Sequence, residues 1–268
     1  MSCPASSPNG DFYYPLIFGQ DGRDRITGGE LNDFLYGGGG DDLLFGRDGD
    51  DLLDGGEDDN YLVGGDGIDI FYGGEGNDTV SYLVQGNGVG AVVDLAAGRG
   101  YGLADGERFD GMENVAGSDW DDVLSGDGND NELSGYGGAD ALYGLGGDDW
   151  LWGGAEDDIL TGGKGNDRLH GGGGTIPSGN DFLAGESGED IFVFDEEWGQ
   201  DEVFDFEDGI DLIEIHNRPG GVTLIDWSQL SITQDGIDIL IGYGSNEIRF
   251  WGWGVQIGDF SADDFIFT

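Results

Sequence analysis

Basic residues are scarce in this chain of 268 residues. Lysine and arginine together number 9 against 57 aspartates and glutamates, so the formal net charge is −48, and Lys164 is the single lysine. A negative field of this size repels nucleic acid and anionic lipid, which excludes both as partners. It attracts cations instead, and a compact fold requires that something neutralise the charge.

Cysteine and long apolar runs are also lacking. Cys3 is the only cysteine, so no disulfide can form within the chain. No apolar run approaches the roughly 18 residues of a membrane span, so we expect no transmembrane segment. The stretch before Arg23 contains neither a basic residue nor an apolar core, so no Sec-type signal peptide is predicted.

Glycine is abundant, with 58 residues, and it divides the chain into units of nine residues. Seven units follow one another without a break from Gly19 to Ser81. Eight more run from Gly117 to Val193, and one of these, GGGGTIPSGNDFLA, carries five extra residues. All fifteen units begin with Gly and have an aliphatic residue or Phe at position eight, and thirteen have Asp at position six.

The order of residue types within a unit predicts a turn followed by a strand. Glycines allow the backbone to turn at positive φ, so positions one to six are expected to form a tight turn and positions six to nine a very short strand. Side chains alternate along a strand, so position eight points inward while positions seven and nine point outward. The residues at position eight should therefore stack as one core row in each block: Ile26, Leu35, Leu44, Leu53, Leu62, Phe71 and Val80, and then Leu124, Leu133, Leu142, Leu151, Leu160, Leu169, Leu183 and Phe192.

The unit closely resembles the G-G-x-G-x-D-x-U-x nonapeptide of the RTX, or hemolysin-type, calcium-binding repeat family. The resemblance implies an all-β fold with two right-handed parallel β-roll blocks, a connecting arm and a C-terminal β cap. It divides the chain into an N-terminal tail (1–18), a first roll block (19–81), the connecting arm (82–116), a second roll block (117–193) and a cap with a secretion signal (194–268).

Calcium is the cofactor that the resemblance implies. In the family's fold, units i and i+2 lie above one another, so position-six residues 18 apart face one ion, which gives about eleven potential sites by stacking. Calcium is a hard cation that takes 6–8 oxygen ligands, and carboxylates with turn carbonyls offer only oxygen. Asn60 and Asn131 lack a formal charge, so their sites are expected to be weaker. The predicted metal-site residues are Asp24, Asp33, Asp42, Asp51, Asn60, Asp69, Asp78, Asp122, Asn131, Asp140, Asp149, Asp158, Asp167, Asp181 and Asp190, with the turn glycines Gly22, Gly38, Gly40, Gly49, Gly65, Gly67, Gly74, Gly76, Gly138, Gly147, Gly154, Gly163 and Gly165.

Residues for catalysis are not evident in the sequence. Adjacent acidic pairs such as Asp41 and Asp42 fall on repeat positions five and six, which favours a structural role over acid–base chemistry. His170 lies at an outward repeat position and His216 in the cap, and there is no HExxH motif, so no catalytic zinc site is expected. A G-x-S-x-G nucleophile elbow is also absent from the sequence. We therefore predict no enzymatic activity and no catalytic residues.

The favoured function is that of a secreted protein that folds when it binds calcium outside the cell. The terminal sequence SADDFIFT resembles the uncleaved signal of type I secretion, so the expected partners are calcium ions and type I secretion machinery, and the expected location is extracellular. Two alternatives remain open. One is a carbohydrate-binding or adhesive β-roll whose outward aromatics, such as Tyr143, Trp150 and Trp152, stack on polysaccharide. The other is the C-terminal module of a secreted polysaccharide-active enzyme.

The outward positions of the repeats carry many apolar side chains, including Phe34, Tyr36 and Tyr72. Leaving so many exposed would create an apolar patch, since burying each is worth about 1.5–3 kcal/mol. We therefore expect the outer faces to be covered within the chain, by the arm, the cap or the other roll.

Overall fold

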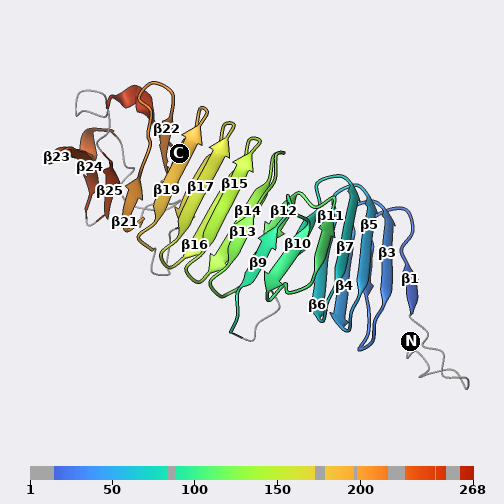
Figure 1. Cartoon of the computed structure of the whole chain (residues 1–268). Coiled ribbons are helices and arrows are strands. Elements are labelled where there is room, and N and C mark those ends of the chain that lie inside the picture. The colour runs from blue at the N-terminus through green and yellow to red at the C-terminus, as the bar shows by residue number, and fades with distance from the viewer. Residues whose placement is uncertain are drawn as a thin grey trace, which may run out of the picture. The chain divides into compact units, whose positions relative to one another are not determined.

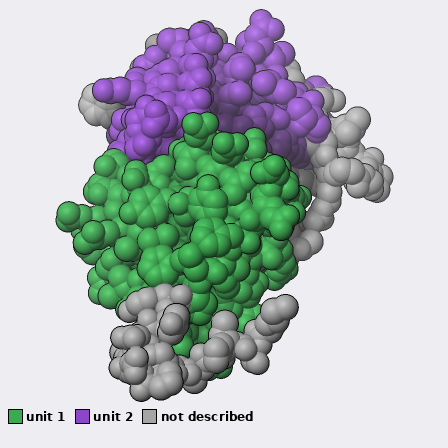
Figure 2. All heavy atoms as spheres, turned by 90° about the vertical axis from the view of Figure 1, so that its right-hand side faces the viewer, with its two compact units in different colours: residues 1–116 green, residues 117–268 purple. Residues whose placement is uncertain are grey.

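The computed structural model describes residues 15–83, 88–172, 179–195, 198–216, 227–244, 246–251 and 260–268. Cys3, most of the predicted N-terminal tail and residues 173–178 of the insertion lie outside the described residues. The chain forms two compact units, residues 1–116 and 117–268, which Figure 2 distinguishes by colour. No described helix is long and apolar enough to cross a membrane.

The first unit consists of two sheets, and successive strands of the repeats alternate between them (Figure 1). Neighbouring strands are parallel, except that β10 is antiparallel to β9 and to β11. The first sheet has the order β1 (Leu16–Phe18), β3 (Phe34–Gly39), β5 (Leu52–Glu57), β7 (Ile70–Glu75), β11 (Arg108–Asp110), β10 (Arg99–Gly102) and β9 (Ala91–Asp94). The second has the order β2 (Arg25–Thr27), β4 (Leu43–Asp48), β6 (Tyr61–Asp66), β8 (Thr79–Ser81) and β12 (Asn114–Ala116).

The second unit repeats this plan and ends in an antiparallel hairpin and two short 3₁₀ helices, η1 (Trp227–Gln229) and η2 (Ala262–Asp264). One sheet has the order β13 (Val123–Ser125), β15 (Ala141–Gly146), β17 (Ile159–Lys164), β19 (Phe182–Ser187), β21 (Gln200–Val203), β25 (Asn246–Phe250), β24 (Asp238–Tyr243) and β23 (Ser231–Asp235). The other has the order β14 (Glu132–Gly137), β16 (Trp150–Ala155), β18 (Arg168–Gly172), β20 (Ile191–Phe194), β22 (Leu212–Ile215) and β26 (Phe265–Phe267).

The residues at position eight form the core, as the repeat predicted. Leu44, Leu53 and Leu142 are fully buried, and the outward neighbours in the same strands are half-buried. The pairing register places Leu35 beside Leu53, two units on. Because alternate units belong to different sheets, the core of each block is two facing rows of side chains rather than the single row expected.

The strands are longer than the sequence predicted. β5 begins at position seven of one unit, Leu52, and continues through Gly55 and Gly56 to position three of the next, Glu57. The turn therefore occupies only positions four to six. Asp58 and Glu156 replace the fourth glycine of their units and adopt φ of 68° and 78°, a left-handed conformation that non-glycine residues reach at a steric cost.

The expectation that the outer faces are covered is wrong for the first unit. Phe34, Tyr36 and Tyr72 remain 37%, 40% and 40% exposed. The arm pairs with the free edges of both sheets, through β11 beside β7 and β12 beside β8. An arm that prolongs the sheets in this way satisfies backbone hydrogen bonds but leaves the outer face open.

Candidate calcium sites

The position-six side chains form hydrogen-bonded ladders along the edges of the rolls. The backbone N–H of Asp33 donates to Oδ1 of Asp51 at 2.7 Å, and that of Asp51 donates to Oδ1 of Asp69 at 2.8 Å. The spacing becomes 23 residues across the insertion, where Asp158 donates to Asp181 at 2.9 Å. The structure thus brings together four rows: Asp24, Asp42, Asn60 and Asp78; Asp33, Asp51 and Asp69; Asp122, Asp140, Asp158 and Asp181; and Asn131, Asp149, Asp167 and Asp190.

In nine of the described ladder residues, the second carboxylate oxygen, Oδ2, is buried and has no hydrogen-bond partner. A buried carboxylate left without a partner costs several kcal/mol, so such a row requires a proton or a cation at each rung. The described residues with an unpartnered, buried Oδ2 are Asp42, Asp51, Asp69, Asp78, Asp140, Asp149, Asp158, Asp167 and Asp181.

A second oxygen converges on the same place from the adjacent rung. An ideal Cβ built on Gly46, at position one of its unit, would lie 2.5 Å from the carbonyl oxygen of Gly64 and against Oδ2 of Asp51. The absent side chain leaves two oxygen atoms facing one point, which suits a hard cation. The same cradle of carboxylate and carbonyl oxygen recurs along the rolls, for example at Gly28, Gly135, Gly144 and Gly153.

Sequence reasoning missed these position-one glycines, although all fifteen units begin with Gly. It selected glycines at positions two and four, and the structure gives those a conformational role. All thirteen have positive φ: Gly22, Gly38, Gly40, Gly49, Gly65, Gly67, Gly74, Gly76, Gly138, Gly147, Gly154, Gly163 and Gly165.

Burial raises the pKa of several ladder carboxyls, and the neighbouring carboxylates raise it further. The pKa of Asp51 and of Asp69 rises to about 7, that of Asp140 to about 8 and that of Asp158 to about 9. In each case removal from water is the largest cause, because a buried charge loses its hydration. At these four residues the ion-free ladder therefore favours the protonated carboxyl up to about neutral pH.

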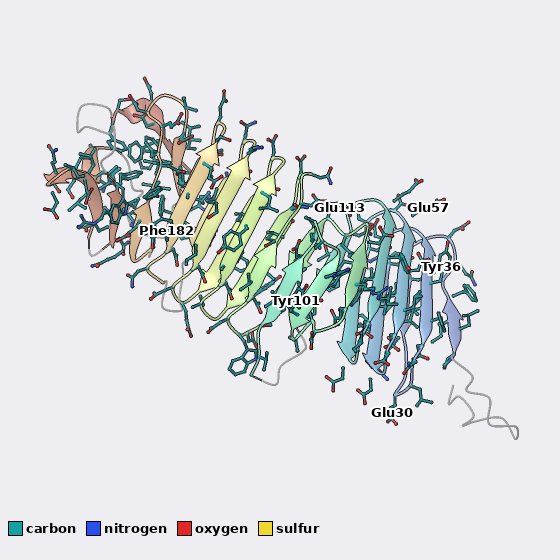
Figure 3. The ribbon with its side chains drawn as sticks, in the orientation of Figure 1. Glu30, Tyr36, Glu57, Tyr101, Glu113 and Phe182 are labelled. Atoms are coloured by element: carbon teal, nitrogen blue, oxygen red, sulfur yellow. The ribbon has the colours of Figure 1, made fainter. Side chains whose placement is uncertain are left out.

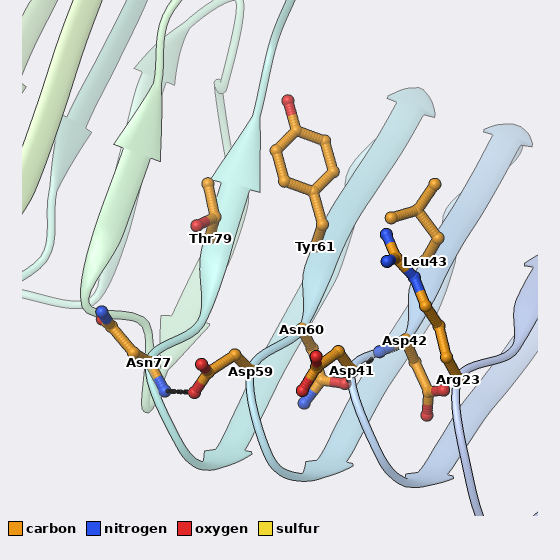
Figure 4. A pocket seen from close by; sticks show the side chains of 9 residues that line it. All are labelled: Arg23, Asp41, Asp42, Leu43, Asp59, Asn60, Tyr61, Asn77 and Thr79. Atoms are coloured by element: carbon orange, nitrogen blue, oxygen red, sulfur yellow. Dashed lines mark hydrogen bonds between the residues drawn. The ribbon is translucent and has the colours of Figure 1, made fainter.

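Position five forms a second, exposed ladder of opposite direction. The backbone N–H of Asp148 donates to Oδ1 of Asp130, 18 residues earlier, at 2.7 Å, and that of Asn166 donates to Asp148 at 2.7 Å. In the first unit this row borders an open hollow of about 240 Å³ (Figure 4). The residues that line it are Arg23, Asp41, Asp42, Leu43, Asp59, Asn60, Tyr61, Asn77 and Thr79.

The ladders of the second unit continue into the cap, which the sequence reasoning did not anticipate. The N–H of Asp181 donates to Asp201 at 3.0 Å, and that of Asp190 donates to Asp211 at 3.1 Å. Burial raises the pKa of Asp201 to about 9. The sequence pattern that could have revealed these two residues is Asp-x-apolar, which both cap segments share with positions six to eight of the repeat.

The two histidines are not distant, contrary to the expectation from sequence. The ring centroids of His170 and His216 lie 6.0 Å apart. His216 contacts Asp195 at 3.0 Å and Glu214 at 2.9 Å, and Arg168 pairs with Glu214 at 2.7 Å. The His170 ring, whose Nε2 lies 3.6 Å from Asp195, and the Arg168 guanidinium beside Glu214 lower the pKa of these two carboxyls, so this is an ion-pair network.

Nowhere in the described part of the chain do three or more His, Cys, Asp or Glu side chains form a metal-binding group. A ladder site differs from such a group because it brings together two carboxylate side chains instead of three or more. Its other oxygen atoms are backbone carbonyls.

A family model described as the RTX calcium-binding nonapeptide repeat matches residues 18–53, 54–82, 116–151, 143–175 and 178–196. The chain belongs to this RTX repeat family. No curated protein matches it.

Among solved structures, the chain is similar to the extracellular lipase LipA from Serratia marcescens, with 21% identity over 97% of this chain and a TM-score of 0.40. It spans 41% of that lipase's length. It is also similar to the AlgE6R3 and AlgE6R2 subunits of the Azotobacter vinelandii mannuronan C5-epimerase. The identities are 26% and 27%, each over 56% of this chain and over 80% and 89% of the subunit, with TM-scores of 0.34 and 0.33.

The RTX cradle predicts a sharp difference between two glycine substitutions. Gly46→Ala is expected to lower calcium affinity at least tenfold, because the new Cβ would occupy the point that Asp51 and Gly64 face. Gly128→Ala is the matched control, since nothing lies within 4 Å of its Cβ position. Calcium titration followed by circular dichroism measures both, and equal midpoints would contradict the cradle.

A second prediction concerns pH in the absence of calcium. An acid whose pKa is raised on folding stabilises the folded state at low pH, and that stability is lost as pH rises through the folded pKa. With Asp51 and Asp69 at about 7, the β signal of the calcium-free chain should increase as pH falls from 8 to 5. An unchanged or decreasing β signal over this range in far-UV circular dichroism would be the opposite outcome.

Proposed function

We propose that this RTX repeat protein is secreted, folds outside the cell on binding calcium, and performs no catalysis within this chain. The rows of buried Oδ2 atoms without a partner, several of which face the carbonyl oxygen of the adjacent rung, are the observation that carries the proposal. In this role, the position-six side chains of both roll blocks and the turn carbonyls are the calcium ligands. Asn60 and Asn131 supply no charge, so their sites bind more weakly.

In this proposal, bound calcium stabilises the turns by neutralising their stacked carboxylates. Each unit contributes one large buried side chain, and the short strands alone offset the loss of chain entropy poorly. Stacked carboxylates oppose folding until a divalent ion neutralises them. Binding free energy then becomes folding free energy, as it does for other small metal-dependent domains.

Calcium dependence of folding tests the proposal directly. The chain should be largely disordered below micromolar calcium and β-rich near the millimolar level typical of extracellular calcium modules. Far-UV circular dichroism before and after chelation measures this, and an equally β-rich, compact chain after chelation would refute it.

A matched pair of variants locates the effect in the ladder. Asp51→Asn should raise the calcium midpoint severalfold, because Asp51 is 2% exposed and lies within its row. Asp48→Asn removes an exposed carboxylate at the end of β4 and should behave as the unmodified chain.

Export through a type I system is the second part of the proposal. The segment that carries the acidic and apolar residues of the predicted signal is folded into the cap: η2 has a capping box from Ser261 to Asp264, and β26 pairs with β22. Phe265 is buried there. A transporter could therefore bind this segment only before the chain folds, which agrees with folding that waits for external calcium.

Deletion of residues 194–268 should abolish export in cells that express a type I exporter, while deletion of residues 2–14 should leave it unchanged. Immunoblots of the medium and of the cell fraction measure the ratio. Normal export of the first deletion variant would rule out a signal in this region.

Carbohydrate binding remains a second candidate because the first unit has an open aromatic face. Phe18 lies beside Tyr36 on adjacent strands, with ring centroids 6.0 Å apart, and Tyr72 lies two strands further on, about 10 Å from Tyr36 at ordinary strand spacing. Tyr36 is labelled on this face in Figure 3. Exposed aromatic rings in a row suit stacking on successive sugar rings.

Glycan-array binding of the calcium-loaded protein tests this candidate. Replacement of both Tyr36 and Tyr72 by Ala should lower binding at least tenfold, and Leu31→Ala, at a side chain that is 62% exposed, is the control. Absence of any glycan bound by the unmodified protein would remove the candidate.

A further inference from the structure

The arm between the two blocks reproduces part of the repeat without its glycine pattern. β11 and β12 pair in parallel with β7 and β8, so each prolongs one sheet of the first unit. Phe109 and Val115 continue the two core rows, and Phe109 stacks on Phe71 with ring centroids 5.5 Å apart. Both strands thus occupy the position of the next repeat unit.

The residue two places before each of these core side chains is a glutamate. In the repeat, position six precedes the core residue at position eight by two places. Glu107 precedes Phe109, and Glu113 precedes Val115, in the same way. Register then places Glu107 in the row of Asp69, and Glu113 in the row of Asp78.

Glu113 makes the hydrogen bond that defines the ladder. The backbone N–H of Asp78 donates to Oε2 of Glu113 at 2.8 Å, as the N–H of Asn60 donates to Asp78 at 2.8 Å. The N–H groups of Glu113 and Asn114 donate in turn to the carbonyl oxygen of Asp78. Glu113 therefore occupies the rung that Asp would occupy in a repeat unit.

The cradle of oxygens is present at this rung as well. An ideal Cβ on Gly73 would lie 2.5 Å from Oδ2 of Asp78 and closer still to the carbonyl oxygen of Gly111. Gly111 belongs to the arm and has the place that position one of a further unit would have. Asp78 is fully buried, and its Oδ2 has no hydrogen-bond partner.

The other edge of the roll ends in a similar arrangement. Glu107 is 2% exposed, and its Oε2 accepts a hydrogen bond from the Tyr82 hydroxyl. Its Oε1 is buried without a hydrogen-bond partner, as is Oδ2 of Asp69. Among the described residues, neither Asp69 nor Glu107 forms an ion pair with a basic side chain.

We propose that Glu107 and Glu113 are calcium ligands, which complete one further site at each edge of the first roll together with Asp69 and Asp78. Both glutamates lie outside the segments that match the repeat family, which end at residue 82 and resume at 116. The arm in this view is a calcium-dependent end cap that closes both ladders. The proposal rests on the proposed calcium-dependent folding and adds ligands that are not part of any nonapeptide.

Counting bound calcium in single variants of the full chain tests the proposal. Glu113→Gln and Glu107→Gln should each bind one ion fewer than the unmodified protein, and the double variant two fewer, by equilibrium dialysis with atomic absorption. The matched controls are Glu57→Gln and Glu30→Gln, which change exposed glutamates at the two edges of the same unit. Figure 3 shows Glu57 and Glu113 along one edge and Glu30 at the other.

An unchanged ion count in both Gln variants would overturn the proposal while leaving calcium-dependent folding intact. If the unmodified chain binds no calcium, the proposed function itself fails. Should either Gln variant fail to fold in saturating calcium, Glu113→Lys or Glu107→Lys takes its place, because the ammonium group can neutralise the facing Asp. Each Lys variant should fold and bind one ion fewer, and a full complement of ions in them would equally overturn the proposal.

Discussion

Repulsion between stacked, buried carboxylates is the constraint on which this structure depends. The backbone ladder fixes the position-six residues one above another, because Oδ1 of each accepts the N–H of the residue two units away. In nine of these residues the same geometry buries the other oxygen and leaves it without a hydrogen-bond partner. Backbone hydrogen bonds hold the carboxylates in a regular stack, but the repulsion between them destabilises the folded state. The free energy of folding therefore depends on the cation or proton that neutralises them.

The glycines and the carboxylates are two parts of one site. Glycine at position one leaves room where Gly64 O and Asp51 Oδ2 face the same point, and glycine at positions two and four gives the backbone the positive φ that each turn needs. Substitutions at these two kinds of position should fail for different reasons. A side chain at position one fills the ion site, whereas a side chain at position four strains the turn, as Asp58 and Glu156 already do.

The arm and the cap, which are not repeat units, extend the ladders with a carboxylate and an inward apolar residue. Glu107 and Glu113 in the arm, and Asp201 and Asp211 in the cap, each precede an inward apolar residue by two places. These segments keep the carboxylate and the core residue but not the glycine turn. Each lies at the end of a ladder, where no further unit has to stack on it, so the tight turn is no longer required.

The sequence by itself determined the repeat period and the inward position eight, because both follow from the nine-residue pattern. The resemblance to the repeat family supplied the rows of position-six residues, since it implied two units per turn. Only the tertiary structure decided the rest. It brought His170 and His216 together, because β18 and β22 both pair with β20. It also left Tyr36 and Tyr72 exposed, because the arm satisfied its backbone hydrogen bonds at the sheet edges. The glutamates of the arm joined the ladders for the same reason: strand pairing, which the sequence does not encode locally, set their register.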